Sequence, residues 1–186
     1  MKRVFALLLL AMGAMIFVKT ASAENEAGTS AAISYSNTAK YCAVKVDYTK
    51  KKMAVKKVLQ KYESPLLPYT DAFIATCSKY GIDCYLLPAI AGLESTFGKF
   101  ILPDSNNAWG WVGGLKIFPS WEAGIDEVGR GLKYNYIDRG RDTVDTIGPM
   151  YSESPTWAVR VNIFMREFQR EEDKLDSLLT ANNKTL

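Results

Sequence analysis

The chain has 186 residues, with 23 Lys and Arg against 20 Asp and Glu, and it contains no histidine. The absence of histidine excludes His-based catalytic triads and imidazole proton shuttles, and it removes the commonest ligand of zinc. Three cysteines are too few for a four-cysteine metal cluster. We therefore expect neither a metal nor a cofactor.

The first 23 residues are typical of a secretory signal peptide. Lys2 and Arg3 precede an uncharged run over 4–18, and Ala21-Ser22-Ala23 is a small-residue cleavage pattern. The run is shorter than the roughly 20 apolar residues that cross a bilayer. We expect cleavage, no transmembrane span afterwards, and a secreted or cell-envelope protein; an uncleaved anchor is the alternative.

The net charge of the chain after removal of the signal peptide indicates which kinds of molecule it can bind. The leader holds three basic residues and no acidic one, so the rest of the chain has 20 of each. A net charge of zero argues against nucleic acid, which binds to basic surfaces. Eight lysines still cluster between residues 40 and 61. They predict either the solvated face of a helix or a surface attracted to an anionic wall polymer or membrane.

The segments before residue 64 differ in composition. Residues 24–40 are small and polar and predict a flexible linker. Residues 41–63 form a lysine-rich arm and helix: 41–48 predict a strand or an extended arm, and 49–63 carry apolar residues on one helical face. Prolines at 65 and 68 end this helix.

Residues 64–180 predict one mainly α-helical domain. Residues 98–119 are rich in Gly, Asn, Asp and Trp and predict loops, with or without a short β-hairpin, that line a cleft. Cap residues and apolar spacing place the helices. These are a helix from Pro68 to Gly81, a helix capped by Asp83 that carries Glu94, a helix over 121–135 capped by Ser120, a short helix or turn over 143–150, and a last helix from Ser154-Pro155 to about Leu179.

Three cysteines in an exported chain suggest one disulfide and one spare thiol. Cys77 lies in the last turns of one predicted helix and Cys84 at the start of the next. A tight turn through Gly81 can bring their Cα atoms within bridging distance. We expect this pair to form the disulfide and Cys42 to be left over, unless Cys77 is only a small buried apolar residue.

Glu94 is the candidate catalytic residue. It follows Ile90 by four residues and Leu87 by seven, so it falls on the helix face that the pattern predicts to be buried. Burial and the partial negative charge of a helix C-terminus both raise the pKa of a carboxyl. A carboxyl that keeps its proton near neutral pH can act as a general acid. A solvated glutamate at a helix end is the alternative.

Four motifs in order carry a family resemblance. They are the stretch from Ala89 to Lys99 with Glu94-Ser95 at its centre, Asn-Asn-Ala-Trp-Gly over 106–110, Phe-Pro-Ser-Trp-Glu-Ala-Gly-Ile over 118–125, and Tyr151 ahead of the last helix. Together they resemble the glucosaminidase branch of the lysozyme-like superfamily (mannosyl-glycoprotein endo-β-N-acetylglucosaminidase-like), which is related to lytic transglycosylases and goose-type lysozymes. The resemblance spans roughly residues 64–168 and implies a lysozyme-like helical domain with a short β-hairpin or loop lobe. Val112 stands where many relatives carry glycine, which leaves the hairpin conformation open.

The resemblance implies a secreted, monomeric peptidoglycan hydrolase that cleaves the β-1,4-linked amino-sugar backbone as an endo-β-N-acetylglucosaminidase. Glu94 would be its general acid. Tyr151 would orient the substrate or stabilise the transition state, unless it only seals the helix entry. The alternatives are a lytic transglycosylase or muramidase on the same glycan, a wall-binding module without activity, and an adaptor that presents the lysine-rich arm.

Substrate contacts are expected in the loop. Trp109 and Trp111 alternate with glycines, so we expect one to stack on a sugar ring and the other to pack in the core. Asn106 and Asn107 either bind N-acetyl and hydroxyl groups of the glycan or shape the turn. Ser95 is expected to bond the backbone near the helix end.

A second carboxylate, which most glycosidases use, is not evident. The nearest acids are Asp104, in the loop, and Glu122, which suits the first turn of a helix. Without one, the N-acetyl oxygen of the sugar can stabilise the cation, or a neighbouring hydroxyl can attack and leave an anhydro product.

Overall fold

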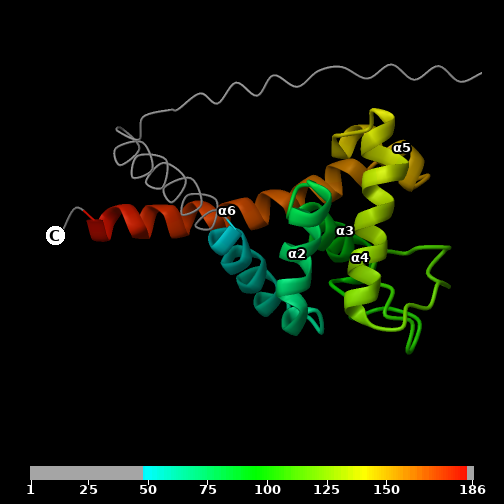
Figure 1. Cartoon of the computed structure of the whole chain (residues 1–186), viewed down its shortest axis with the longest axis horizontal. Coiled ribbons are helices and arrows are strands. Elements are labelled where there is room, and N and C mark those ends of the chain that lie inside the picture. Colours follow the sequence, from blue (N-terminus) through cyan, green and yellow to red (C-terminus); the bar gives the residue numbers. More distant parts are fainter. Residues whose placement is uncertain (1–47, 184–186) are drawn as a thin grey trace, which may run out of the picture. The chain divides into compact units, whose positions relative to one another are not determined.

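Helices make up the regular secondary structure of residues 48–183, and no strand occurs among them (Figure 1). This computed structural model describes those residues. The predicted signal peptide 1–23, the linker 24–40 and most of the arm, including Cys42, lie outside them. The prediction of a mainly α-helical protein is confirmed. The hairpin option is not met in the described residues, where 98–119 form turns and irregular loop.

The first helices lie where the sequence predicts them. Residues 48–61 are helical, a short 3₁₀ turn covers Leu67–Tyr69, and α2 covers Thr70–Tyr80. Gly81 then takes a left-handed conformation (φ 61°), which glycine adopts at little cost and which ends the helix as predicted. The next helix, α3, covers Leu86–Ser95. The prediction that Asp83 caps this helix is wrong: Tyr85 is the N-cap, and Asp83 accepts a hydrogen bond from the Tyr85 amide (2.8 Å) in the turn before the helix begins.

The second half differs from prediction at two points. Helix α4 covers Trp121–Gly131 with Ser120 as its cap, but it continues as a π-helix over Leu132–Tyr136 and a 3₁₀ turn over Ile137–Arg139. Helix α5 covers Val144–Tyr151, with Thr143 as its cap. Helix α6 covers Trp157–Asn183. It begins after Ser154-Pro155 because these residues form a turn, in which the Ser154 carbonyl accepts from the Trp157 amide (3.1 Å).

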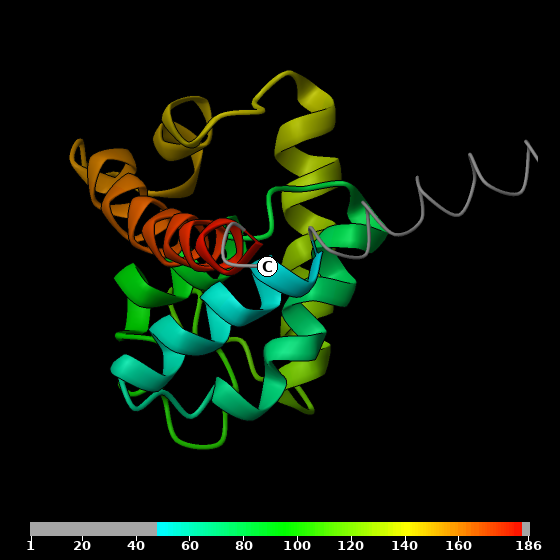
Figure 2. The same cartoon turned by 90° about the vertical axis from the view of Figure 1, so that its left-hand side faces the viewer.

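Helix α3 lies at the centre of the packing. It contacts α6, while α2 packs against α4 and α5 against α6 (Figures 1 and 2). All residues from Leu86 to Gly92 are buried, so the helix is surrounded rather than covered on one face. The aromatic part of the core includes Phe73, Phe97, Trp109, Phe118 and Phe168. No helix among the described residues is both long enough and apolar enough to span a bilayer.

Ion pairs attach the lysine-rich helix to α6. Lys61 donates to the buried Glu167 (2.6 Å), and Lys51 lies 3.3 Å from the buried Glu172. A further pair joins Lys50 to Asp176. Three lysines of the cluster thus face acids of the last helix, so the cluster has a structural role that neither sequence-based interpretation included.

The predicted disulfide is present. Cys77 and Cys84 are bonded, with their Cα atoms 4.9 Å apart. The bridge joins the end of α2 to the turn before α3. It therefore fixes the approach of the chain to the helix that carries Glu94.

Candidate functional site

Glu94 lies in the last turn of α3, and its side chain is exposed. The prediction that it is buried is wrong. Ser95, the next residue of α3, is buried, so the helix stays in the core to its end. Glu94 is exposed because its side of the last turn lines a cavity instead of packing against another segment. The carboxylate is nevertheless held in place, since the Trp157 indole Nε1 donates to its Oε1 at 2.7 Å.

Gly110 lies against the other carboxylate oxygen. It has a left-handed backbone (φ 68°), and a Cβ added there would lie 3.0 Å from Glu94 Oε2. Both the conformation and the close approach require glycine. The loop between α3 and α4 thus touches the carboxylate through its backbone.

Two cavities meet at Gly110. The first, here named the acid cavity, has a volume of about 400 Å³. Glu94 and Lys99 are its charged residues, and residues 100–102 supply an apolar wall. Its full lining is Glu94, Ser95, Lys99, Phe100, Ile101, Leu102, Asn107, Gly110 and Gly114.

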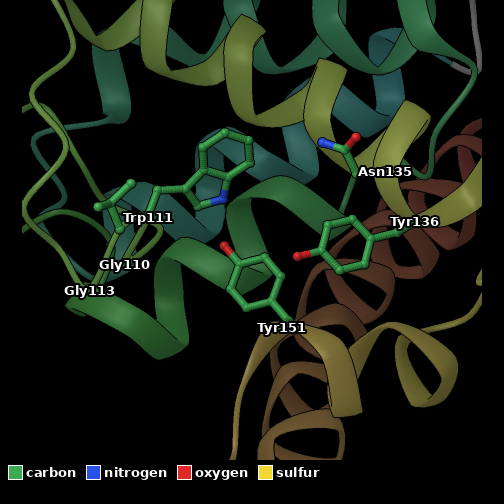
Figure 3. A pocket seen from close by; sticks show the side chains of 7 residues that line it. Gly110, Trp111, Gly113, Asn135, Tyr136 and Tyr151 are labelled. Atoms are coloured by element: carbon green, nitrogen blue, oxygen red, sulfur yellow. The ribbon is translucent and has the colours of Figure 1, made fainter.

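The second cavity, here named the tyrosine cavity, has a volume of about 350 Å³. Figure 3 shows the rings of Trp111, Tyr136 and Tyr151 around it, with Asn135 beside Tyr136. Gly110, Val112 and Gly113 complete the lining. The π-helix supplies Asn135 and Tyr136, and such turns are frequent at functional sites.

Tyr151 links the tyrosine cavity to Glu94. Its ring stacks on Trp157, with centroids 4.8 Å apart and an interplanar angle of 26°. Its hydroxyl donates to the Trp109 carbonyl at 2.8 Å. Burial, followed by the charge of Glu94, raises the pKa of Tyr151 well above its usual value of 10, while the Trp111 side chain acts in the opposite direction. The hydroxyl is therefore a neutral donor near Glu94 at ordinary pH.

The two loop tryptophans have different environments. Trp109 is fully buried and donates from Nε1 to the Leu87 carbonyl (3.0 Å), so its predicted contact with substrate is wrong for this conformation. Trp111 is half-buried, packs on Gly131 of α4 and lines the tyrosine cavity. Trp109 is thus the tryptophan that packs in the core, and stacking of Trp111 on a sugar ring stays a prediction.

The two asparagines shape the loop. Asn107 is buried; its amide nitrogen donates to the carbonyls of Trp111 (2.9 Å) and Lys116 (3.1 Å), and its oxygen accepts from the Trp111 amide (3.2 Å). Asn106 donates to the Phe118 carbonyl (3.0 Å) and lines neither cavity. The turn-shaping alternative therefore describes both, although Asn107 also reaches the wall of the acid cavity.

Ser95 bonds the backbone, as expected. Its hydroxyl donates toward the carbonyls of Ala91 (3.0 Å) and Ala108 (2.8 Å), and it accepts from the Gly98 amide (2.8 Å). Ser95 thereby ties the end of α3 to the loop that holds Gly110.

Glu94 is accompanied by no second carboxylate in the lining of either cavity, within the part of the chain that the structure describes. Asp104 and Glu122 are both exposed, and Glu122 lies in the first turn of α4, as the sequence indicated. Within residues 48–183 there is also no cluster of three or more Cys, Asp or Glu that could hold a metal ion. Glu94 is thus the one acid of the two cavities in these residues.

Sequence reasoning missed four residues of the site. They are Trp157, Lys99, Asn135 and Tyr136, for which the sequence predicts no role in the site. Trp157 follows Tyr151 by six residues, and this proximity was the available signal. The placement of Asn135 and Tyr136 depends on the π-helix, for which the sequence carried no recognised cue.

Comparison with protein-family models gives no match, and no curated protein matches the chain. The case for function therefore rests on the chemistry of the site and on the motif resemblance.

Proposed function

We propose that this protein is an exported glycoside hydrolase with a lysozyme-like fold that cleaves the β-1,4-linked amino-sugar backbone of peptidoglycan, in the manner of an endo-β-N-acetylglucosaminidase. The observation that carries the proposal is the carboxylate of Glu94, which lines the acid cavity and lies against Gly110, the residue that this cavity shares with the tyrosine cavity. Sugar units on both sides of such a carboxyl would place their linking oxygen next to it.

Glu94 is the general acid of this proposal. Its Oε1 accepts from Trp157, so Oε2 is the oxygen that carries and delivers the proton. Cleavage of a glycosidic bond requires this proton on the departing oxygen, because the sugar becomes oxocarbenium-like in the transition state. The Trp157 hydrogen bond would hold the carboxyl at a fixed angle to the bond.

The positive charge of that state needs a partner other than a second carboxylate, since none lines the cavities in the described residues. The sugar's own N-acetyl oxygen or a neighbouring hydroxyl can supply one. Tyr151, which stacks on Trp157, would orient that group. If a hydroxyl of the sugar attacks, its proton passes to the Glu94 carboxylate and the product is anhydro. If the N-acetyl oxygen attacks, water then opens the adduct, gives its proton to Glu94 and leaves a hydrolysed end. A lytic transglycosylase on the same glycan is therefore the second candidate.

Glu94→Gln tests the proposal. The amide keeps the shape of the side chain but has no acidic proton, so release of soluble fragments from purified peptidoglycan should fall at least about 10²-fold. Glu122→Gln is the matched control, because Glu122 is exposed and lines neither cavity; it should keep wild-type activity. Near-normal cleavage by Glu94→Gln contradicts the assignment. Mass spectrometry of the fragments would separate hydrolysed from anhydro ends.

A further inference from the structure

Lys99 is the cation of the acid cavity, and no other Lys or Arg lines either cavity among the described residues. Its side chain is exposed. Lys79, Lys116, Lys133 and Lys174 each pair with a carboxylate, whereas no ion pair involves Lys99 in residues 48–178. The Lys99 ammonium therefore forms no ion pair with the described part of the protein; the other charged residue of the cavity, Glu94, accepts a hydrogen bond from Trp157.

The wall beside Lys99 is apolar and open to solvent. Phe100 is 75% exposed and Leu102 46% exposed, and both line the acid cavity with Ile101 between them. Exposed apolar groups that gather beside a cavity mark a binding surface. A cation next to such a wall suits a ligand whose carboxylate is attached to an apolar group.

The tyrosine cavity has a different chemistry. Its lining contains no charged side chain and presents aromatic rings together with the Asn135 amide. Aromatic faces and an amide suit a neutral sugar with an N-acetyl group. The tyrosine cavity is thus lined by uncharged residues, whereas the acid cavity carries both Lys99 and Glu94.

The glycan of the proposed function alternates in the same way. One of its two sugars is neutral, and the other carries a lactyl ether whose carboxylate is either free or extended by an acidic peptide. We infer that the acid cavity binds the carboxylate-bearing sugar, with Lys99 as counter-ion and Phe100 against the apolar part of its substituent, and that the tyrosine cavity binds the neutral sugar. The identity of the glycan rests on the proposed function; the charge preference of the acid cavity rests on its lining.

Binding measurements test this preference without cleavage. Calorimetric titrations in a Glu94→Gln background would use three ligands of equal length: a peptide-free peptidoglycan tetrasaccharide with free lactyl carboxylates, the same tetrasaccharide with its peptides, and a neutral N-acetylglucosamine tetramer. Lys99→Met should weaken binding of at least one anionic ligand about tenfold, the scale of a lost charge-assisted hydrogen bond. The neutral tetramer should change by less than about twofold.

Two control variants test whether the effect of Lys99→Met comes from the positive charge at this position. Lys99→Arg keeps the charge and should retain most of the affinity for the anionic ligands. Lys56→Met removes an exposed lysine that lines neither cavity and should change nothing. The loss caused by Lys99→Met should also shrink as ionic strength rises, because salt screens exposed charges.

The anionic ligands separate the two sources of carboxylate. A loss confined to the peptide-free ligand assigns the lactyl carboxylate, and a loss confined to the peptide-bearing ligand assigns the peptide. An equal loss for all three ligands, or no loss for any, overturns the inference. Failure of the wild type to cleave peptidoglycan would defeat the proposed function, while Lys99-dependent binding of anionic glycan would still support the inference.

Discussion

Gly110 and Gly113 have similar backbones and different surroundings. Both are left-handed, with φ of 68° and 61°. A Cβ at Gly110 would meet the Glu94 carboxylate, whereas one at Gly113 would meet nothing within 4 Å. The pair therefore separates the cost of the conformation from the cost of displacing the carboxylate.

Gly110→Ala should abolish most glycan cleavage, because the new methyl group pushes Glu94 away from the bond to be cleaved. Gly113→Ala should lower the free energy of unfolding by a similar amount, about 1–2 kcal/mol. It should lose far less activity when folded, because the added methyl group meets no atom within 4 Å even though Gly113 lines the tyrosine cavity. Urea unfolding and turnover measured on the same preparations check this. Equal activity of the two variants would show that the position of Glu94 does not depend on Gly110.

Tyr151 and Tyr136 face the same cavity but differ in hydrogen bonding. The Tyr151 hydroxyl bonds the Trp109 carbonyl, and no such bond is found for Tyr136 in the described residues. Their rings lie 6.0 Å apart. The phenylalanine variants remove only the hydroxyl and leave the ring to pack.

Tyr151→Phe should lower kcat by about tenfold or more with little change in KM, since the hydroxyl is expected to act on the transition state. Tyr136→Phe is the control in the same cavity and should alter KM at most. Steady-state kinetics on soluble glycan fragments measure both. An unchanged kcat for Tyr151→Phe would reduce Tyr151 to a packing residue.

At the scale of elements, some caps were predictable because they depend on local chemistry. Gly81 and Ser120 end and begin helices where the sequence placed them. The sequence predicts Pro155 as the first residue of the last helix, two residues before the observed start, since a Ser-Pro pair suits both a helix cap and the turn that forms here. Trp157 is therefore the first residue of α6, and its indole nitrogen donates to Glu94 from there.

The site was predictable in part. The motif around Glu94 and Tyr151 identified two residues that the fold brings close to one indole ring, that of Trp157. The exposure of Glu94 and the roles of the asparagines depend on packing between segments distant in sequence. Periodicity within one helix contains no information about such packing.

The contact between α6 and the lysine-rich helix depends on buried carboxylates. Glu167 is 9% exposed and accepts from both Lys61 and the Tyr62 hydroxyl (3.0 Å). Its neighbour along the helix, Glu171, pairs with Lys174 nearer the surface. Glu167 and Glu171 are thus the same residue type on the same helix and differ in burial.

Glu167→Ala should lower the free energy of unfolding by about 1–3 kcal/mol, because it removes the acceptor of the Tyr62 hydroxyl and leaves a gap between helices. Glu171→Ala should stay within about 0.5 kcal/mol of the wild type, as surface substitutions usually do. Urea unfolding followed by circular dichroism compares them. Equal effects would mean that burial of Glu167 adds nothing to the helix contact.

At the scale of the whole molecule, folding raises the pKa of three tyrosines and two lysines that titrate at high pH. Burial is the first cause that raises the pKa of Tyr62, Tyr136 and Tyr151. Hydrogen bonds to carboxylates raise the pKa of Lys61 and Lys79. All five groups hold their protons more tightly in the folded chain than in the unfolded chain.

Stability should therefore fall in alkaline solution. Unfolded tyrosines lose their protons near pH 10, while the folded ones keep theirs to higher pH. Above about pH 10 the folded state then binds more protons than the unfolded state, so the free energy of unfolding decreases as pH rises. Below that pH these groups are protonated in both states and their contribution is constant. Urea unfolding should give equal stability at pH 8 and 9 and a clear loss by pH 11, and Tyr151→Phe should make the loss smaller. Stability that is constant or rising between pH 9 and 11 would contradict the burial of these hydroxyls, because exposed tyrosines titrate alike in both states.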